Sequence, residues 1–207
     1  GTIVADNEDE LCALSALAAA RGVCQRILLR ITPGIDPHTH KAVRTGNVDS
    51  KFGSAIATGQ AAAIVKKALS LPGVRLAGFH CHIGSQIFDV TPFADAAGIM
   101  MDFIAAVKKE TGFEAEELNL GGGLGVPYTE DDRTVDYAAA IGKIAENARA
   151  HAARAGVTLP RVILEPGRSL VAAAGITLYT VGSVKEIPGF RNYVSIDGGM
   201  PDNPRYA

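Results

Sequence analysis

The 207-residue sequence has no basic run, no long apolar run and little cysteine, and each shortage argues against a class of protein. Because the formal net charge is -2, nucleic acid is not expected as a partner. The longest apolar stretches fall well short of the about 18 residues of a membrane-spanning helix, and no signal segment opens the chain, so we expect a cytoplasmic protein without a membrane partner. Cys12, Cys24 and Cys81 have neither metal-site nor disulfide spacing, and we interpret them as free thiols.

The residues that are present have an ordinary globular balance, 47% apolar and 20% charged. The length is sufficient for one substantial domain with a buried core. The sequence begins at Gly1 inside an apolar run and stops at Ala207, shortly after a glycine-rich segment. Neither end is typical of a natural terminus, so we expect part of a longer protein.

Short apolar runs alternate with helical segments along most of the chain. We expect helices near residues 6–21, 58–71, 91–112 and 135–155, and strands near residues 2–5, 26–32, 74–83, 118–120 and 161–164. Apolar strands separated by helices are typical of parallel βα units whose two faces are both buried. Beyond Glu165 the pattern becomes β-rich, and a Pro-Gly turn between segments 176–186 and 191–196 predicts an antiparallel hairpin.

Five βα units fit either a doubly wound sheet or part of an eight-stranded barrel. Polar and glycine residues gather where the expected strands end, at His80 and His82, at 121–123 and at 165–168. Barrel active sites lie at the carboxyl ends of the strands. Open sheets also bind ligands there, so this placement favours the barrel only slightly.

Gly121, Gly122 and Gly123 follow an expected strand directly. Such a turn lets backbone N–H groups approach an anion and predicts a phosphate-binding loop, although a plain tight turn explains the same residues. The loop is not a nucleotide-binding P-loop, because no Gly-Lys-Ser/Thr follows, and it lacks the GxGxxG dinucleotide spacing.

Glu165, Pro166, Gly167 and Arg168 place a carboxylate and a guanidinium at another strand end. Arginine suits bidentate contact with phosphate or carboxylate, and a carboxylate leaving a buried strand needs a partner. From the residues alone, a ligand site and a structural Glu–Arg pair are equally plausible.

His80 and His82 lie two residues apart on one expected strand and therefore share a face. No third ligand has a convincing spacing, so we predict no metal site. The alternative is one core histidine satisfied by the backbone and one functional ring, which could stack on a planar cofactor. Ser85, just beyond, could bind phosphate.

Several segments together resemble one known family. They are DSKFG (49–53), HCHIGSQIFD (80–89), LNLGGGLGVPY (118–128), ILEPGRSLV (163–171) and DGGMPDNPRYA (197–207). As a set they resemble the alanine-racemase-like, fold-type III pyridoxal-phosphate enzymes, and within them the decarboxylases that act on diaminopimelate. The resemblance implies an α/β fold in which residues 1–172 form the C-terminal part, about five βα units, of a (β/α)8 barrel. Residues 173–207 would begin a β domain.

The resemblance also implies roles around a pyridoxal 5'-phosphate cofactor. The catalytic residues would be His82, stacked on the cofactor ring, and Glu165, paired with its pyridine nitrogen. Arg30 would lie near the phenolic oxygen, and Arg205 would bind a substrate carboxylate, with Arg168 as a second candidate for that task. The phosphate end would be held by the serine, the glycine loop and the Glu-Pro-Gly-Arg turn, that is, by Ser85, Gly121, Gly122, Gly123, Pro166, Gly167 and Arg168.

In this family a lysine forms a Schiff base with the cofactor. None of the eight lysines of this sequence stands at the corresponding position, and the resemblance places that lysine upstream of residue 1. The chain as given is therefore expected to be inactive. The full-length enzyme is expected to be a homodimer of lysine biosynthesis that converts meso-2,6-diaminopimelate to L-lysine. The alternatives are an ornithine- or diamine-pathway decarboxylase and a non-catalytic relative that binds the cofactor or a partner.

Overall fold

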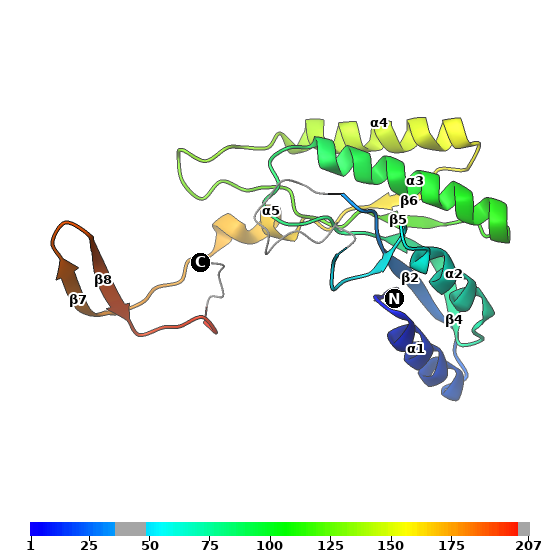
Figure 1. Ribbon diagram of the computed structural model, residues 1–207, viewed down its shortest axis with the longest axis horizontal. Helices are drawn as coiled ribbons and strands as arrows, with labels where there is room; N and C mark the ends of the chain where they lie inside the picture. Colours follow the sequence, from blue (N-terminus) through cyan, green and yellow to red (C-terminus); the bar gives the residue numbers. More distant parts are fainter. Residues whose placement is uncertain (36–48, 203–207) are drawn as a thin grey trace. The chain divides into compact units, whose positions relative to one another are not determined.

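The computed structural model describes residues 1–35 and 49–202 (Figure 1). The chain divides into two compact units, Gly1–Leu170 and Val171–Ala207. None of the helices in the described ranges has both the length and the apolar character needed to cross a bilayer.

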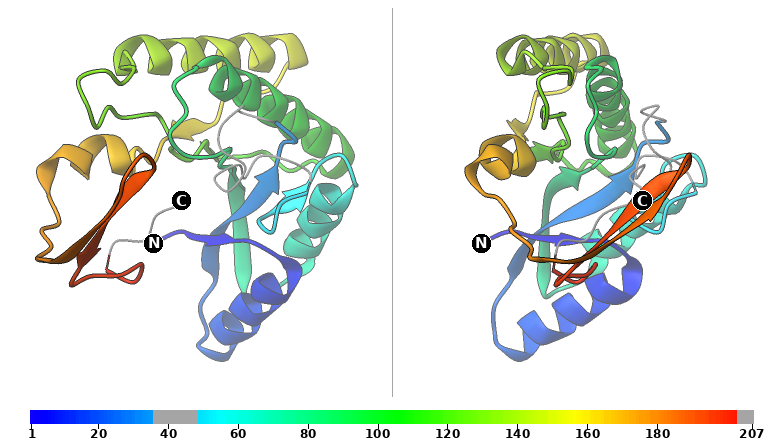
Figure 2. Two further views of the ribbon diagram at one scale, coloured as in Figure 1. Left: turned by 60° about the vertical axis from the view of Figure 1, so that its left-hand side comes forward. Right: turned by 90° about the vertical axis from the view of Figure 1, so that its left-hand side faces the viewer.

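The first unit is built on a parallel sheet (Figure 2). Its strands follow the order β1-β2-β4-β5-β6, and the two-residue strand β3 pairs with β2. The predicted parallel βα units are confirmed, whereas β3 was not predicted. The strand bounds are β1 Ile3–Ala5, β2 Gln25–Thr32, β3 Ser54–Ala55, β4 Val74–His80, β5 Glu117–Asn119 and β6 Arg161–Ile163.

The helices begin and end largely where their capping residues indicate. The Asn7 side chain accepts from Glu10 N at the start of α1, and Gly112 ends α3 in the left-handed conformation. Helix α2 begins at Gln60 with Gly59 as its N-cap residue, and Thr58 Oγ1, from the residue before, accepts from Gln60 N at 3.5 Å. The short helix α5 was not predicted. The bounds are α1 Glu8–Ala20, α2 Gln60–Ser70, α3 Thr91–Thr111, α4 Tyr137–Ala155 and α5 Gly167–Val171.

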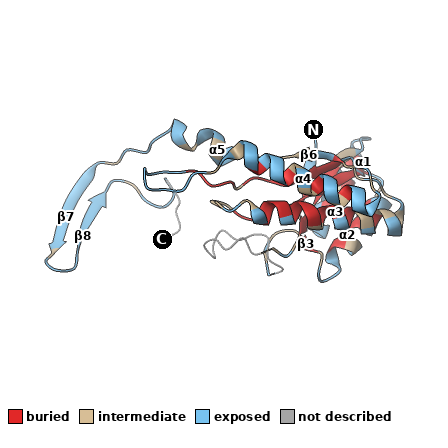
Figure 3. Cartoon of the chain, turned by 90° about the horizontal axis from the view of Figure 1, so that it is seen from above, coloured by how far each residue is buried: buried red, intermediate tan, exposed pale blue. Residues whose placement is uncertain are grey.

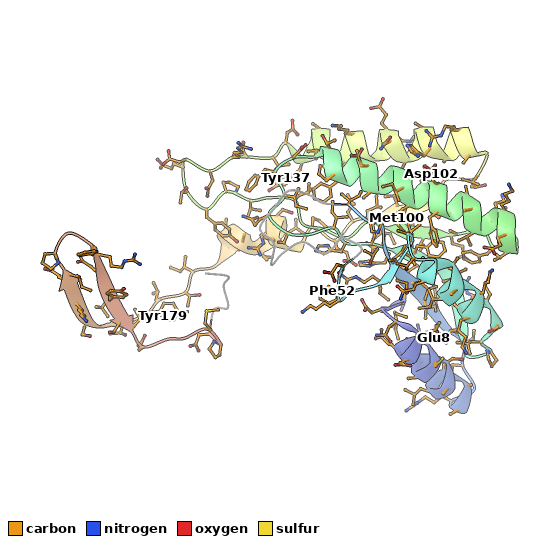
Figure 4. The ribbon with its side chains drawn as sticks, viewed as in Figure 1. Glu8, Phe52, Met100, Asp102, Tyr137 and Tyr179 are labelled. Carbon is orange, nitrogen blue, oxygen red and sulfur yellow. The ribbon has the colours of Figure 1, made fainter. Side chains whose placement is uncertain are left out.

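The core of this unit lies between the sheet and its helices, where the buried side chains gather (Figure 3). Phe79 of β4 is fully buried and meets Phe103 of α3 edge to face, with ring centroids 5.1 Å apart. Helix α4 packs along α3, and Asp102 of α3 pairs with Arg154 at 3.1 Å between them (Figure 4). Apolar helix faces therefore pack against the sheet, and the polar side chains of the strands lie mainly at the strand ends.

A cluster of ion pairs joins the amino ends of the central strands. Glu117 opens β5 with only 4% of its side chain exposed, and it pairs with Arg26 of β2 at 3.0 Å and with Arg161 of β6. The neighbouring Glu116 pairs with Arg26 at 2.6 Å and with Arg75 of β4. The buried Glu117 carboxylate thus links β2, β5 and β6 through ion pairs at the end of the sheet opposite to the candidate site.

The second unit contains the predicted antiparallel hairpin. Strands β7 (Val181–Ile187) and β8 (Arg191–Ile196) pair through a turn that holds Gly189 at a φ of +77°. Apolar side chains such as Val184 and Val194 are exposed on it.

Replacing Glu117 by alanine should destabilise the full-length protein by about 1–3 kcal/mol, because two arginines lose a buried partner. Glu146→Ala, at an exposed position on α4, is the matched control and should change stability by less than about 0.5 kcal/mol. Urea unfolding followed by circular dichroism measures both. Equal midpoints for the two variants would contradict a structural role for the cluster.

Candidate functional site

The sheet register brings polar residues from three strands into one row. Arg30 of β2 lies beside His80 of β4, and His80 lies beside Asn119 of β5. These are the last residues, or nearly the last, of their strands, so they mark the carboxyl end of the sheet. Glu165 follows β6 two residues beyond Ile163, the register partner of Asn119.

A cavity of about 430 Å³ opens at this end of the sheet. Its volume lies within the range of about 300–1,000 Å³ that is usual for small-molecule sites. Its lining includes Arg30, His82 and Glu165, which the resemblance assigned to the cofactor site, and also His80. The complete lining is Val4, Asp6, Glu10, Arg30, His80, His82 and Glu165.

The Glu165 carboxylate is held by side chains from two neighbouring strands. Its Oε1 accepts a hydrogen bond of 2.8 Å from Asn119 Nδ2, and its Oε2 lies 3.5 Å from His80 Nε2. Burial, the largest effect, lowers the pKa of His80, so this imidazole is neutral near pH 7. Neither of these two neighbours is therefore a cation, and the Arg30 guanidinium acts on the carboxylate only through longer-range electrostatics.

His82 presents a neutral imidazole to the cavity. Burial, together with the nearby charge of Arg30, lowers its pKa to about 4. Its Nδ1 faces the Gly122 N–H at 3.3 Å and acts as acceptor, so the ring proton belongs on Nε2. A flat uncharged ring that lines the cavity suits stacking on a planar cofactor.

His80 differs from the expectation of a core histidine satisfied by the backbone. It is buried, and its Nδ1 has no hydrogen-bond partner within the part of the chain that the structure describes. Its other nitrogen faces Glu165 instead, which indicates a place in the site. Across residues 1–35 and 49–202, no three His, Cys, Asp or Glu side chains form a metal-binding group.

Arg30 is fixed by the segment DSKFG. Its guanidinium lies 4.3 Å from the ring centroid of Phe52 (Figure 4) and 3.4 Å from Asp6 Oδ1. Gly53 N–H donates to the same Asp6 oxygen at 3.2 Å. Burial lowers the pKa of Arg30, an effect that Asp6 opposes. Phe52 and Gly53 thus keep a guanidinium and its partner carboxylate on one wall of the cavity.

The glycine loop packs against neighbouring backbone. A Cβ atom on Gly122 would lie 2.0 Å from Glu165 O, and one on Gly123 would lie 1.9 Å from Gly84 O. Two of the three amides already have protein acceptors, since Gly121 N donates to Asn119 Oδ1 at 2.9 Å and Gly122 N faces His82. Close packing explains these glycines, and phosphate binding by the loop stays a prediction.

The other predicted site residues that the structure describes do not line the cavity. Arg168, on α5, is exposed and donates to Tyr128 Oη at 2.6 Å. Ser85 and Pro166 lie in adjoining loops, and Gly167 is the first residue of α5. Arg205 lies outside the described residues.

Sequence reasoning missed several residues of the site. Asp6 was placed only at the start of an expected helix, His80 was interpreted as a possible core residue, and Asn119 appeared only within a quoted motif. His80 and Asn119 are each a polar residue inside an otherwise apolar expected strand, and this is the only local signal; the strand register shows that they lie side by side. Nothing local indicated that Asp6 faces Arg30, because 24 positions separate them and only the strand pairing of β1 with β2 brings them together.

Comparisons with known proteins show the family of this chain. Residues 1–172 match the family described as "Pyridoxal-dependent decarboxylase, pyridoxal binding domain". The chain belongs to the pyridoxal-dependent decarboxylase family. The predicted resemblance to fold-type III pyridoxal-phosphate decarboxylases is thereby confirmed.

Among relatives in this family, the chain is 46% identical over its whole length to the diaminopimelate decarboxylase of Bacillus subtilis and covers 47% of it. It is 44% identical to the diaminopimelate decarboxylase of Halalkalibacterium halodurans, again covering 47%. The chain thus spans about half the length of the curated relatives it matches.

Solved structures show the same fold. The diaminopimelate decarboxylase of M. jannaschii, in co-complex with L-lysine, matches 99% of this chain and 46% of its own, with a TM-score of 0.81 and 38% identity. The Helicobacter pylori enzyme complexed with L-lysine matches with a TM-score of 0.78 and 28% identity, over 96% of this chain and 47% of its own.

The cavity fits the pyridoxal group of this decarboxylase family on its own geometry. A carboxylate without a cationic hydrogen-bond partner can hold a protonated ring nitrogen, a neutral imidazole can lie on the ring face, and a guanidinium can meet an oxygen substituent. Glu165, His82 and Arg30 supply these three groups around one cavity.

The low pKa of His82 predicts a specific acid sensitivity. In the cofactor-free full-length protein its ring should stay neutral from about pH 5 to 8. In the unfolded chain the pKa of His82 is 6.5, so below that pH the unfolded chain binds a proton that the folded protein does not. The free energy of unfolding should therefore fall as the pH is lowered from 6.5 to about 4. His80 contributes with the same sign.

Imidazole NMR of wild type against His82→Phe assigns the signal, and urea unfolding at each pH gives the stability. Histidines of the unfolded protein are the internal reference. A folded His82 ring that titrates like that reference would contradict the buried neutral state.

Proposed function

We propose that the full-length protein containing this chain uses pyridoxal 5'-phosphate to decarboxylate meso-2,6-diaminopimelate to L-lysine. The proposal rests chiefly on the Glu165 carboxylate, which lines the cavity of a pyridoxal-binding domain and has no cationic hydrogen-bond partner among residues 1–35 and 49–202. When bound, the cofactor supplies an electron sink for the carbanion left by loss of carbon dioxide. Glu165 would keep the proton on the ring nitrogen, which deepens that sink.

The remaining residues of the cavity would each contact a different part of the cofactor. His82 would cover one ring face, and Arg30, steadied by Asp6 and Phe52, would meet the phenolic oxygen. The phosphate is assigned to Ser85, Gly121, Gly122, Gly123, Pro166, Gly167 and Arg168. For Arg168 this assignment requires that it leave Tyr128, its present partner.

The choice of substrate is supported by the relatives. The decarboxylases at 46% and 44% identity are named for diaminopimelate, and two solved relatives hold L-lysine, the expected product. A substrate with a second amino-acid end needs a cation for its distal carboxylate, and Arg205 is proposed for that contact, with Arg168 as the second candidate. The lysine/ornithine decarboxylase from Vibrio vulnificus shares only 23% identity and supports the fold alone.

We also propose that the five βα units are the C-terminal part of a (β/α)8 barrel in residues 1–172, with a β domain starting at residue 173. The sites at the carboxyl ends of the strands support this assignment. The full-length enzyme is proposed to be a cytoplasmic homodimer, which sedimentation equilibrium would test; a monomer at micromolar concentration would refute it.

The full-length protein should release L-lysine from meso-diaminopimelate only when pyridoxal phosphate is present. Product is measured by chromatography, with L-ornithine and L-arginine offered at the same concentration. Turnover of either competitor at an equal or higher kcat/KM would refute the substrate assignment.

The 207-residue chain alone should not form a lysine-linked cofactor. No lysine among the described residues lines the cavity. Lys66 and Lys108 are on helices and pair with glutamates, and Lys143 donates to Thr91 Oγ1. Borohydride reduction with pyridoxal phosphate, followed by digestion and mass spectrometry, should find no single stoichiometric modified lysine. One such lysine would show that the catalytic amine lies within residues 1–207.

A further inference from the structure

Asn119 connects the candidate catalytic carboxylate to the glycine loop. It is the last residue of β5 and is only 5% exposed. Its Nδ2 donates to Glu165 Oε1 at 2.8 Å, while its Oδ1 accepts from Gly121 N at 2.9 Å. One buried amide side chain therefore serves both neighbours, and it does not itself line the cavity.

The orientation of this amide is determined by its partners. Gly121 N–H can only donate, so it requires the Asn119 oxygen. The Asn119 NH₂ group must then face Glu165. Aspartate would keep the acceptor for Gly121 but lose the donor, and an apolar residue of the same size would lose both. Of these side chains, asparagine alone satisfies both neighbours without bringing a charge.

The charged and titratable groups around Glu165 come from three other elements. His80 and His82, from β4 and the loop after it, are neutral because burial lowers the pKa of both. Arg30 of β2 lies 3.4 Å from Asp6, which follows β1. With that guanidinium already paired, a neutral amide holds Glu165 in place without cancelling its charge.

We propose that Asn119 is a positioning residue that holds the Glu165 carboxylate toward the pyridine nitrogen of the cofactor. The inference rests on the proposed function, in which Glu165 meets that nitrogen. It adds that the position of the carboxylate depends on a neutral donor from β5. Without this donor the carboxylate can turn toward solvent, since 51% of its side chain is exposed.

Two substitutions in the full-length protein separate this role from general packing. Asn119→Leu removes the donor and the acceptor at nearly constant volume. Asn119→Asp keeps the acceptor for Gly121 and places a second carboxylate against Glu165. Two carboxylates this close share one proton at low pH, and the shared O–H then replaces the amide donor. At higher pH that proton is lost and the two groups repel each other.

The readout is the nitrogen NMR shift of pyridoxal phosphate labelled with ¹⁵N in its ring, which reports protonation independently of turnover. In wild type the nitrogen should stay protonated across the range in which the protein is folded. In Asn119→Leu the pKa of that nitrogen should fall by about one unit or more. Asn119→Asp should match wild type at the acid end and approach the leucine variant as the pH rises.

Asn147→Leu is the matched control. Asn147 is half-buried on α4 and donates to Ala94 O, away from the cavity, so its loss should leave the nitrogen titration unchanged. If Asn119→Leu fails to fold, the pH-dependent behaviour of Asn119→Asp still decides. The inference is overturned if Asn119→Leu titrates like wild type, or if Asn119→Asp follows the leucine variant at every pH.

Glu165→Gln distinguishes this inference from the function on which it rests. That variant should lower the protonation of the ring nitrogen at least as far as Asn119→Leu. If wild type does not bind the labelled cofactor, or if Glu165→Gln leaves the nitrogen signal unchanged, the proposed function fails and the inference fails with it.

Discussion

Backbone contacts without intervening side chains join the turns that follow β4, β5 and β6, and the candidate site depends on them. Glu165 N donates to Gly121 O at 2.8 Å, and Ile87 N donates to Gly123 O at 3.0 Å. A side chain on Gly122 or Gly123 would collide with the neighbouring backbone. Because the turns meet this closely, side chains leaving three strands can reach one another, and the glycines serve the site whether or not they also touch a phosphate.

The charges at this end of the sheet are kept apart. The Arg30 guanidinium lies 3.4 Å from Asp6 and against the Phe52 ring, while the two side chains that contact Glu165 within the described part of the chain, Asn119 and His80, are neutral. A direct Arg30–Glu165 ion pair would satisfy both charges and leave neither for a ligand. Burial that keeps His80 and His82 neutral preserves this separation, because a cationic imidazole beside Glu165 would compete with a protonated ring nitrogen.

The sequence predicted the elements that depend on local pattern and missed those that depend on packing. Short apolar runs between helices gave the parallel strands, but nothing local marked the two residues of β3, since their pairing with β2 is their only strand character. Arg30, His82 and Glu165 could be found because their residue types follow apolar strands in family-like segments. His80 and Asn119 are recognised as site residues only from the register that sets them side by side. The ligand contact predicted for Arg168 stays a prediction, and in this structure Arg168 donates to Tyr128 Oη.

Strand β5 shows how three residues can serve stability and function together. Side chains alternate along a strand, so Glu117 and Asn119 share one face and Leu118 takes the other. Leu118 is fully buried in the apolar core, while the opposite face carries a charge at its start and a neutral amide at its end. The charge is paired by arginines at the amino end, where ion pairs hold β2, β5 and β6 together. At the carboxyl end an equivalent ion pair would neutralise Glu165, so a neutral donor is the one kind of partner that orders this carboxylate and still leaves its charge available.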